Sequence, residues 1–223
     1  MTAWPAIWLT LQLATITTVI LLIIALPLGW WLARTTSRFR PLVEALTAMP
    51  LVLPPTVLGF YLLIIMRPDA PIGAFWVRVT GDTLAFSFSG LVMASVIYSL
   101  PFAVQPMQTA FMAVPQPVLD AARTLGAGAR DAFFSVSLPL ARRGFITAAV
   151  LSFAHTVGEF GVVLMVGGNI PGKTRVVSIE IFRAVETLDY ETAHTLSLWL
   201  VVASFLVLTL VYFLNRRGGA RVG

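Results

Sequence analysis

The chain has 223 residues, of which 58% are hydrophobic and only 11% are charged, and its mean hydropathy is +0.89. Soluble domains carry about 25% charged residues, so this chain has too much apolar surface for one soluble core and is expected in a lipid bilayer. The same composition excludes disordered and fibrous chains. Cysteine is absent and only two histidines are present, so we expect no disulfide and no metal site.

The net charge of +5 comes from 15 Lys and Arg residues that are scattered over short connections. They form no basic stripe and no aromatic RNA-binding motif, so we expect no nucleic-acid partner. Basic residues that flank apolar segments instead indicate that membrane helices are anchored at the cytoplasmic face.

Five apolar stretches are each long enough to cross a bilayer core, which needs about 20 helical residues. They cover residues 7–33, 47–66, 86–111, 145–166 and 193–214. In each stretch, apolar residues lie on all sides of the expected helix and leave no wide polar face, as expected for membrane spans. The sequence therefore predicts an all-α membrane protein with about five transmembrane helices in one domain, residues 1–223.

The distribution of Lys and Arg predicts the orientation of these spans. Cytoplasmic connections are enriched in basic residues, and one set of connections holds ten of them while the other holds five. We therefore expect the N-terminus outside and the C-terminus inside. The ten are Arg34, Arg38, Arg40, Arg123, Arg130, Arg142, Arg143, Arg216, Arg217 and Arg221, and the five are Arg67, Arg78, Lys173, Arg175 and Arg183.

Three prolines, Pro50, Pro54 and Pro55, interrupt the second span. Each removes a backbone N–H and breaks the helical ladder, which is tolerated at membrane depth where protein or a watery path satisfies the freed carbonyls. Two interpretations stay open, an ordinary kink and a wall of a translocation pathway. Such a pathway would be lined by backbone and hydroxyl groups such as those of Pro54, Pro55, Thr56 and Ser152.

Residues 167–174, GGNIPGKT, match the phosphate-binding loop pattern G-x-x-x-x-G-K-[ST]. A nucleotide site of this kind needs a strand before the loop, a helix after it and a soluble α/β domain around it. Here the end of a membrane span precedes the loop, and the charge rule places Lys173 outside, away from cytoplasmic ATP. We therefore expect no nucleotide site and no catalytic residue, so the chain is not an enzyme.

The longest cytoplasmic connection covers about residues 112–143. Residues 120–125 are expected to form a short helix, with Pro117 before it and with Gly126 and Gly128 to end it. An amphipathic segment that begins near Phe133 follows. A short helix held crosswise under a membrane bundle suits docking into a groove on a cytoplasmic partner.

This connection resembles the EAA loop of ABC-importer permeases, whose pattern is E-A-A, three residues, Gly, nine residues and then I-x-L-P. The match departs at Asp120, where the family usually has Glu, and at Val136, where it has Ile. In the family this loop is the coupling helix that sits in a cleft of the ATPase subunit. The resemblance implies this role for Asp120, Ala121, Ala122, Arg123, Gly126, Leu138 and Pro139.

The resemblance covers nearly the whole chain and narrows to molybdate permeases. The segments that carry it are LVLPPTVLG (51–59), ARTLGAG (122–128), GEFG (158–161) and NIPGKTR (169–175). Sulfate permeases share several of these motifs but usually carry an additional N-terminal helix, and tungstate permeases are close neighbours. The chain departs from the pattern at His155, where many relatives have Arg.

Glu159 falls inside the predicted fourth span. A charge at the bilayer centre costs about 2.5–3.5 kcal/mol on insertion scales, so the side chain is expected to face protein or a cavity. Two interpretations stay open. The carboxylate is either a structural group bonded to a neighbouring helix or to His155 one turn away, or a group on the translocation pathway.

The resemblance implies the type I ABC importer permease fold and a homodimer in the cell inner membrane. It also implies two cytoplasmic ABC ATPase subunits, which use ATP and Mg, and a periplasmic oxyanion-binding protein, while the permease itself binds no cofactor. The alternatives are a tungstate or sulfate permease, an ATPase-independent secondary transporter and a membrane-embedded enzyme. An enzyme would show clustered ionisable groups at one depth and a secondary transporter would show inverted repeats and more spans, and neither pattern is evident.

Overall fold

A computed structural model describes residues 4–216, and these residues form helices and turns without a β-strand. Arg217 and Arg221 of the predicted cytoplasmic set lie outside the described residues. The long helices are α1 (Trp4–Arg34), α5 (Phe88–Met112), α9 (Arg142–Gly158) and α12 (Tyr190–Arg216). The shorter elements are α2 (Arg40–Ala48), η1 (Met49–Leu51), α3 (Pro55–Ile65), α4 (Pro71–Thr80), α6 (Gln116–Thr124), α7 (Ala129–Asp131), η2 (Ala132–Ser137), α8 (Leu138–Leu140), α10 (Gly161–Gly167) and α11 (Val177–Glu186).

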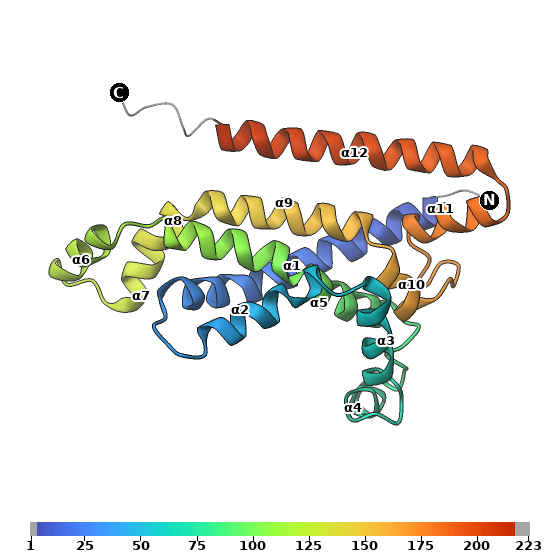
Figure 1. The fold of residues 1–223 in the computed structure, drawn as a ribbon, viewed down its shortest axis with the longest axis horizontal. Helices are drawn as coiled ribbons and strands as arrows, with labels where there is room; N and C mark the ends of the chain where they lie inside the picture. The colour runs from blue at the N-terminus through green and yellow to red at the C-terminus, as the bar shows by residue number, and fades with distance from the viewer. Residues whose placement is uncertain (1–3, 217–223) are drawn as a thin grey trace.

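The centre of the molecule is the bundle of α1, α5 and α9, which run side by side (Figure 1). Small residues let these helices approach closely, as is common between membrane helices. A Cβ at Gly29 of α1 would lie 3.0 Å from Met107, and a Cβ at Gly144 of α9 would collide with Ala110. Several large side chains between these helices, such as Phe111 and Met107, are completely buried.

Three helices are continuous, long and apolar enough to cross a membrane, namely α1, α5 and residues 190–209 of α12. Two bent helix pairs pass the same test, residues 40–51 with 55–65 and residues 129–140 with 142–158. If each bent pair is one span, the described residues contain five spans, in agreement with the predicted number. The predicted all-α class is confirmed for residues 4–216.

The predicted second span, residues 47–66, is broken at its prolines. The chain turns by 109° between Leu51 and Pro55, so that α3 points away from the bundle toward α4 (Figure 1). The cause is the proline pair, because Pro54 has extended backbone (φ −54°, ψ 135°) and neither proline donates a helical hydrogen bond. The predicted proline break is therefore real and far sharper than an ordinary kink.

The predicted fourth span, residues 145–166, is also interrupted. Helix α9 ends at Gly158, Glu159 is extended (φ −67°, ψ 133°), and α10 starts at Gly161. Gly161 lies so close to α3 that a Cβ there would be 2.7 Å from the Cβ of Pro55. Glu159 therefore lies at a helix end and not within a continuous span. The packing of α10 on α3 accounts for the break.

The two ends of the bundle differ in what they carry. The α1–α2 connection and the whole of residues 113–141 lie at one end, whereas α11 and the start of α1 lie at the other (Figure 1). Helix α12 runs along the outside, packs against α9 and α11, and exposes most of its apolar side chains. The basic connections predicted to be cytoplasmic, those after α1 and α5, thus share one end. The side of the membrane that this end faces stays a prediction.

Candidate coupling segment and translocation pathway

Helix α6 is closed at its C-terminal end by a Schellman motif. The Gly126 N–H donates to the Arg123 carbonyl (2.9 Å), and the Ala127 N–H donates to the Ala122 carbonyl (3.0 Å). Gly126 has a φ of +90°, in the left-handed region that glycine adopts without strain. The helix end predicted at Gly126 is therefore present. Its cause is conformational, because nothing lies within 4 Å of a Cβ built there.

Helix α6 starts at Gln116, one turn earlier than the predicted start at Asp120, with Pro117 in its first turn. The predicted helix start at Asp120 is therefore wrong, and Asp120 lies within the helix and not at its positive N-terminal end. The Asp120 Oδ1 instead accepts hydrogen bonds from Gln116 Nε2 (3.0 Å) and from Arg123 Nη1 (3.1 Å). These bonds hold the carboxylate along the side of the helix.

Most of α6 faces away from the bundle. Leu119 is its buried residue, whereas Leu125, just after the helix, is 89% exposed and Val118 is 42% exposed. Ala121 is exposed and Ala122 is half-buried, so neither adds bulk to this surface. Exposed apolar residues beside small ones are typical of a surface that a partner covers.

The second half of the predicted coupling loop consists of α7, a π-helical turn over Ala132–Ser137 and α8. Phe133 packs inward against aromatic rings of α1 and α5, whereas Phe134 is 62% exposed. The predicted amphipathic character is thus confirmed. Leu138 and Pro139 lie in α8, just before the chain bends by 67° into α9.

The five predicted pathway residues do not share one environment in this chain. Pro54 and Thr56 are exposed at the start of α3, and Pro55 is half-buried against α10. Ser152 is completely buried in α9, and its hydroxyl has no hydrogen-bond partner among the described residues. Glu159 is buried at the α9–α10 break. Their role as a pathway or gate stays a prediction.

Glu159 is only 3% exposed, and its carboxylate makes no hydrogen bond of good geometry within residues 4–216, although the Ser95 hydroxyl of α5 lies close enough to interact with it. Of the interpretations left open for Glu159, a bond to His155 is not formed, because the His155 ring faces α5. Its Nδ1 is hydrogen-bonded to Ser99 Oγ (2.8 Å), and the ring stacks on Phe102 with centroids 4.0 Å apart. The backbone carbonyl of Glu159 accepts a hydrogen bond from Ser178 Oγ of α11 (2.6 Å).

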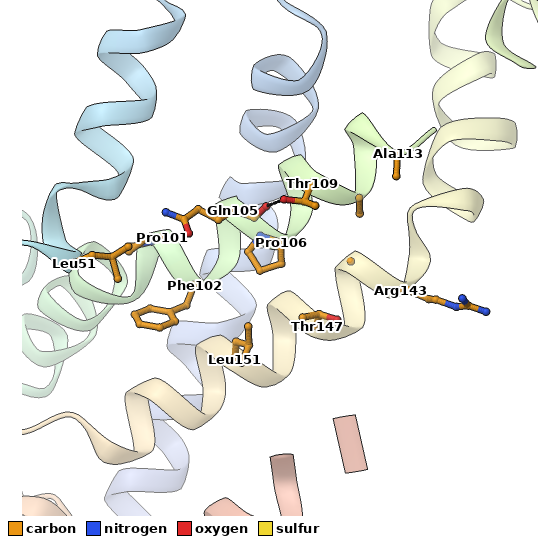
Figure 2. Close-up of a pocket in the computed structure, with 12 residues that line it drawn as sticks. Leu51, Pro101, Phe102, Gln105, Pro106, Thr109, Ala113, Arg143, Thr147 and Leu151 are labelled. Carbon is orange, nitrogen blue, oxygen red and sulfur yellow. Dashed lines mark hydrogen bonds between the residues drawn. The ribbon is translucent and has the colours of Figure 1, made fainter. Parts of the chain in front are cut away.

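A cavity of about 630 Å³ opens between α5 and α9 (Figure 2). Its polar lining consists of Gln105 and Thr109 from α5 and of Arg143 and Thr147 from α9. Within residues 4–216, no three His, Asp or Glu side chains lie together as a metal site would require. The Thr109 hydroxyl donates to the Gln105 carbonyl (2.9 Å), so the groups of this lining that could meet an anion are the Gln105 amide and the Arg143 guanidinium. Sequence reasoning missed this cavity, because its lining comes from two helices and forms no motif.

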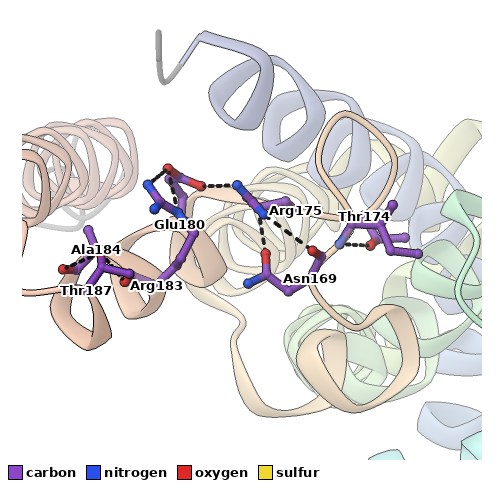
Figure 3. Close-up of polar contacts among 8 residues, drawn as sticks. Asn169, Thr174, Arg175, Glu180, Arg183, Ala184 and Thr187 are labelled. Atoms are coloured by element: carbon purple, nitrogen blue, oxygen red, sulfur yellow. Dashed lines mark hydrogen bonds and ion pairs between the residues drawn. The ribbon is translucent and has the colours of Figure 1, made fainter.

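The loop between α10 and α11 is held by its own polar groups (Figure 3). The buried Thr174 hydroxyl donates to the Gly167 carbonyl (2.7 Å) and accepts from the Ile170 N–H (3.1 Å). Arg175 and Arg183 both pair with Glu180, and the hydrogen bond from Arg183 is the main cause that lowers the pKa of this carboxyl. A helix and not a strand precedes the loop, so the resemblance to a phosphate-binding loop does not extend to its structure.

Comparison with known proteins agrees with this architecture. The molybdenum transport system permease protein ModB of Azotobacter vinelandii is 58% identical over 211 residues, which cover 95% of this chain and 93% of that protein. The ModB protein of Escherichia coli K12 is 34% identical over 221 residues, covering 99% and 96%.

Solved transporters share the fold at low sequence identity. The methionine ABC transporter MetNI in an inward-facing conformation matches with a TM-score of 0.73 at 19% identity, covering 95% of this chain and 94% of that one. A bacterial alginate ABC transporter in complex with its periplasmic protein matches with a TM-score of 0.74 at 15% identity, covering 96% and 78%. The fold is that of type I ABC importer permeases, as predicted.

The family described as binding-protein-dependent transport system inner membrane component matches residues 25–222, nearly the whole chain. Its description agrees with the apolar helices of a multi-pass inner-membrane protein. The chain therefore belongs to this family of inner-membrane transport components.

Proposed function

We propose that this chain is the permease subunit of an ABC importer that carries molybdate across the inner membrane. The observation that carries the proposal is the 58% identity, over almost the full length, to a molybdenum transport permease. The predicted motifs at residues 51–59, 122–128, 158–161 and 169–175 support the same substrate. Tungstate and sulfate remain the alternative oxyanions, and the family match favours an ATP-driven importer over a secondary transporter.

The proposed assembly is a homodimer of this chain, with residues 1–223 as one permease domain, two cytoplasmic ABC ATPase subunits and a periplasmic oxyanion-binding protein. ATP and Mg would be used by the ATPase subunits and not by the permease. The membership in a binding-protein-dependent family supports the last two partners. The N-terminus would face the periplasm and the C-terminus the cytoplasm.

The proposed ATPase-docking surface is α6 with its closing turn, together with α8. Its residues are Asp120, Ala121, Ala122, Arg123 and Gly126 in the first part and Leu138 and Pro139 in the second. Leu125 is the apolar residue that would enter the ATPase groove, because it is 89% exposed and adjoins the Schellman turn. Burial of a Leu side chain stabilises a complex by roughly 1.5–3 kcal/mol.

The cavity between α5 and α9 is the proposed cytoplasmic part of the oxyanion pathway, in addition to the predicted Pro54, Pro55, Thr56, Ser152 and Glu159. Arg143 is the cationic group in its lining. If it attracts the anion, Arg143→Gln should slow oxyanion uptake. Arg142→Gln is the matched control. It removes the same charge at the neighbouring position, and Arg142 does not line this cavity. Equal effects of the two variants would contradict this part of the proposal.

The function is tested by reconstitution of the complete transporter into liposomes. Uptake of labelled molybdate should require external binding protein and ATP on the ATPase side, and excess tungstate and sulfate should be tested as competitors. Uptake without ATP would indicate a secondary transporter. Uptake that sulfate suppresses as strongly as unlabelled molybdate would reject the substrate assignment while leaving the importer assignment intact.

A further inference from the structure

Arg34, the last residue of α1, connects α1 with α6 and with the end of α5. It lies at the end of the bundle that carries residues 113–141, called here the coupling segment. Its Nη2 donates to the carbonyls of Phe111 (3.0 Å) and Val114 (2.9 Å), and its Nη1 donates to Gln116 Oε1 (3.1 Å). The first two acceptors lie at the C-terminal end of α5 and in the turn that follows it. The third acceptor is the side chain of the first residue of α6.

The polar contact continues along α6. Gln116 Nε2 donates to Asp120 Oδ1 (3.0 Å), and the same oxygen accepts from Arg123 Nη1 (3.1 Å). The guanidinium of Arg34 is therefore linked through Gln116 to the acidic residue of the proposed docking surface. No other described element besides the π-helical turn over residues 132–137 makes extensive contacts with α6, so this link is a principal connection between α6 and the bundle.

The preceding turn of α1 holds the other half of the coupling segment. The Trp30 ring packs edge-on against Phe111 and against Phe133, with centroids 5.2 Å apart in each case. The Arg34 guanidinium carbon lies 5.3 Å from the centre of the same Trp30 ring, within cation–π range. The last two turns of α1 thus contact both halves of the segment, one through a hydrogen-bonded fork and one through edge-on aromatic contacts.

We propose that Arg34 is a positioning residue that transmits displacement of the coupling helix α6 to α1 and α5. The inference rests on the proposed function, since it requires an ATPase that moves α6. A guanidinium holds several acceptors in one rigid plane, whereas an ammonium acts as a point charge on a flexible stem. Arg34→Lys therefore keeps the charge that anchors the helix end at the cytoplasmic face and loses the fork that ties α6 to α5.

The test compares transport with ATP hydrolysis in the same proteoliposomes, made with the complete transporter. In Arg34→Lys we expect normal co-purification of the ATPase and continued ATP hydrolysis. The amount of molybdate moved per ATP should fall roughly tenfold, as expected when one charge-assisted hydrogen bond is lost. Arg38→Lys is the matched control, because Arg38 lies in the next connection with its guanidinium over Phe39 and not on α6.

A ratio of molybdate to ATP in Arg34→Lys equal to that of the wild type would overturn the proposal. Should Arg34→Lys fail to assemble, Gln116→Leu gives the decisive measurement, because it removes the α6 acceptor and leaves the bonds to the Phe111 and Val114 carbonyls. The same loss of coupling in Gln116→Leu supports the proposal, and normal coupling refutes it. If the wild-type vesicles show no ATP-dependent uptake, the failure lies in the proposed function and not in the role of Arg34.

Discussion

Replacement of Gly126 by alanine isolates the conformational requirement of the coupling helix. A Cβ at this position meets nothing within 4 Å, so the substitution adds no steric clash. The φ of +90° must nevertheless be kept for the two hydrogen bonds of the Schellman motif. A residue with a Cβ in the left-handed region costs about 1–2 kcal/mol. If docking requires this helix end, the affinity for the ATPase should fall by a factor of about 5–30.

Gly128→Ala is the matched control, because Gly128 is equally open to a Cβ but has a φ of −69° that alanine adopts freely. Titration of the ATPase subunit against the reconstituted permease gives the affinity, and molybdate-stimulated hydrolysis gives the coupling. Gly126→Ala should weaken docking or coupling, whereas Gly128→Ala should match the wild type. If the two variants behave alike, the argument from backbone conformation is refuted. If the bulkier Gly126→Val is also normal, α6 is not the coupling helix.

Three further predictions concern topology, a buried carboxylate and pH. In this cysteine-free chain, a thiol reagent outside should label Asp82→Cys and not Arg130→Cys, and the reverse pattern would invert the orientation. Glu159→Gln should assemble normally, because an amide can keep a contact with the Ser95 hydroxyl, whereas Glu159→Leu should assemble less well because it removes that contact; equal assembly of the two variants would show that this contact has no structural role. Because the pKa of Glu180 is lowered in the folded protein, its ion pairs stabilise α11 above the unfolded value of about 4.3 and lose that effect as pH falls through the folded value. Amide exchange in α11 should therefore rise in acid, and Glu180→Gln should remove this dependence.

The fold was predictable where one physical rule dominates a long segment. Apolar runs such as those of α1 and α5 can satisfy their backbone groups only as helices in a bilayer, so their existence and extent follow from composition. The sharp turn before α3 was foreseen as a proline break, because the missing N–H groups act locally. The break at Glu159 was not predicted, because it depends on the approach of Gly161 to Pro55, a contact between segments far apart in the sequence.

The candidate site likewise has features that local sequence determines and features that depend on tertiary contacts. The end of α6 at Gly126 could be predicted, because a helix stop is a local property of glycine. The start of α6 at Gln116 follows from Pro115 in extended backbone and Pro117 in the first turn, a local signal that also fits a start a few residues later. The partner of His155 is decided by tertiary packing. Its distance of one turn from Glu159 makes a bond between them one possibility, whereas the ring packs against Ser99 and Phe102.

The glycines of this chain show why a motif residue needs a structure before its role is stated. Gly126 has open space and a positive φ, so its value lies in the backbone conformation that it allows. Gly161 is different, because a Cβ there would press against Pro55 and its value lies in the room that it leaves for α3. It follows that the partner groove around Gly126 needs no special cavity for glycine. The groove has only to accept the shape of a helix that ends in a Schellman turn, which any sequence able to form that turn would present.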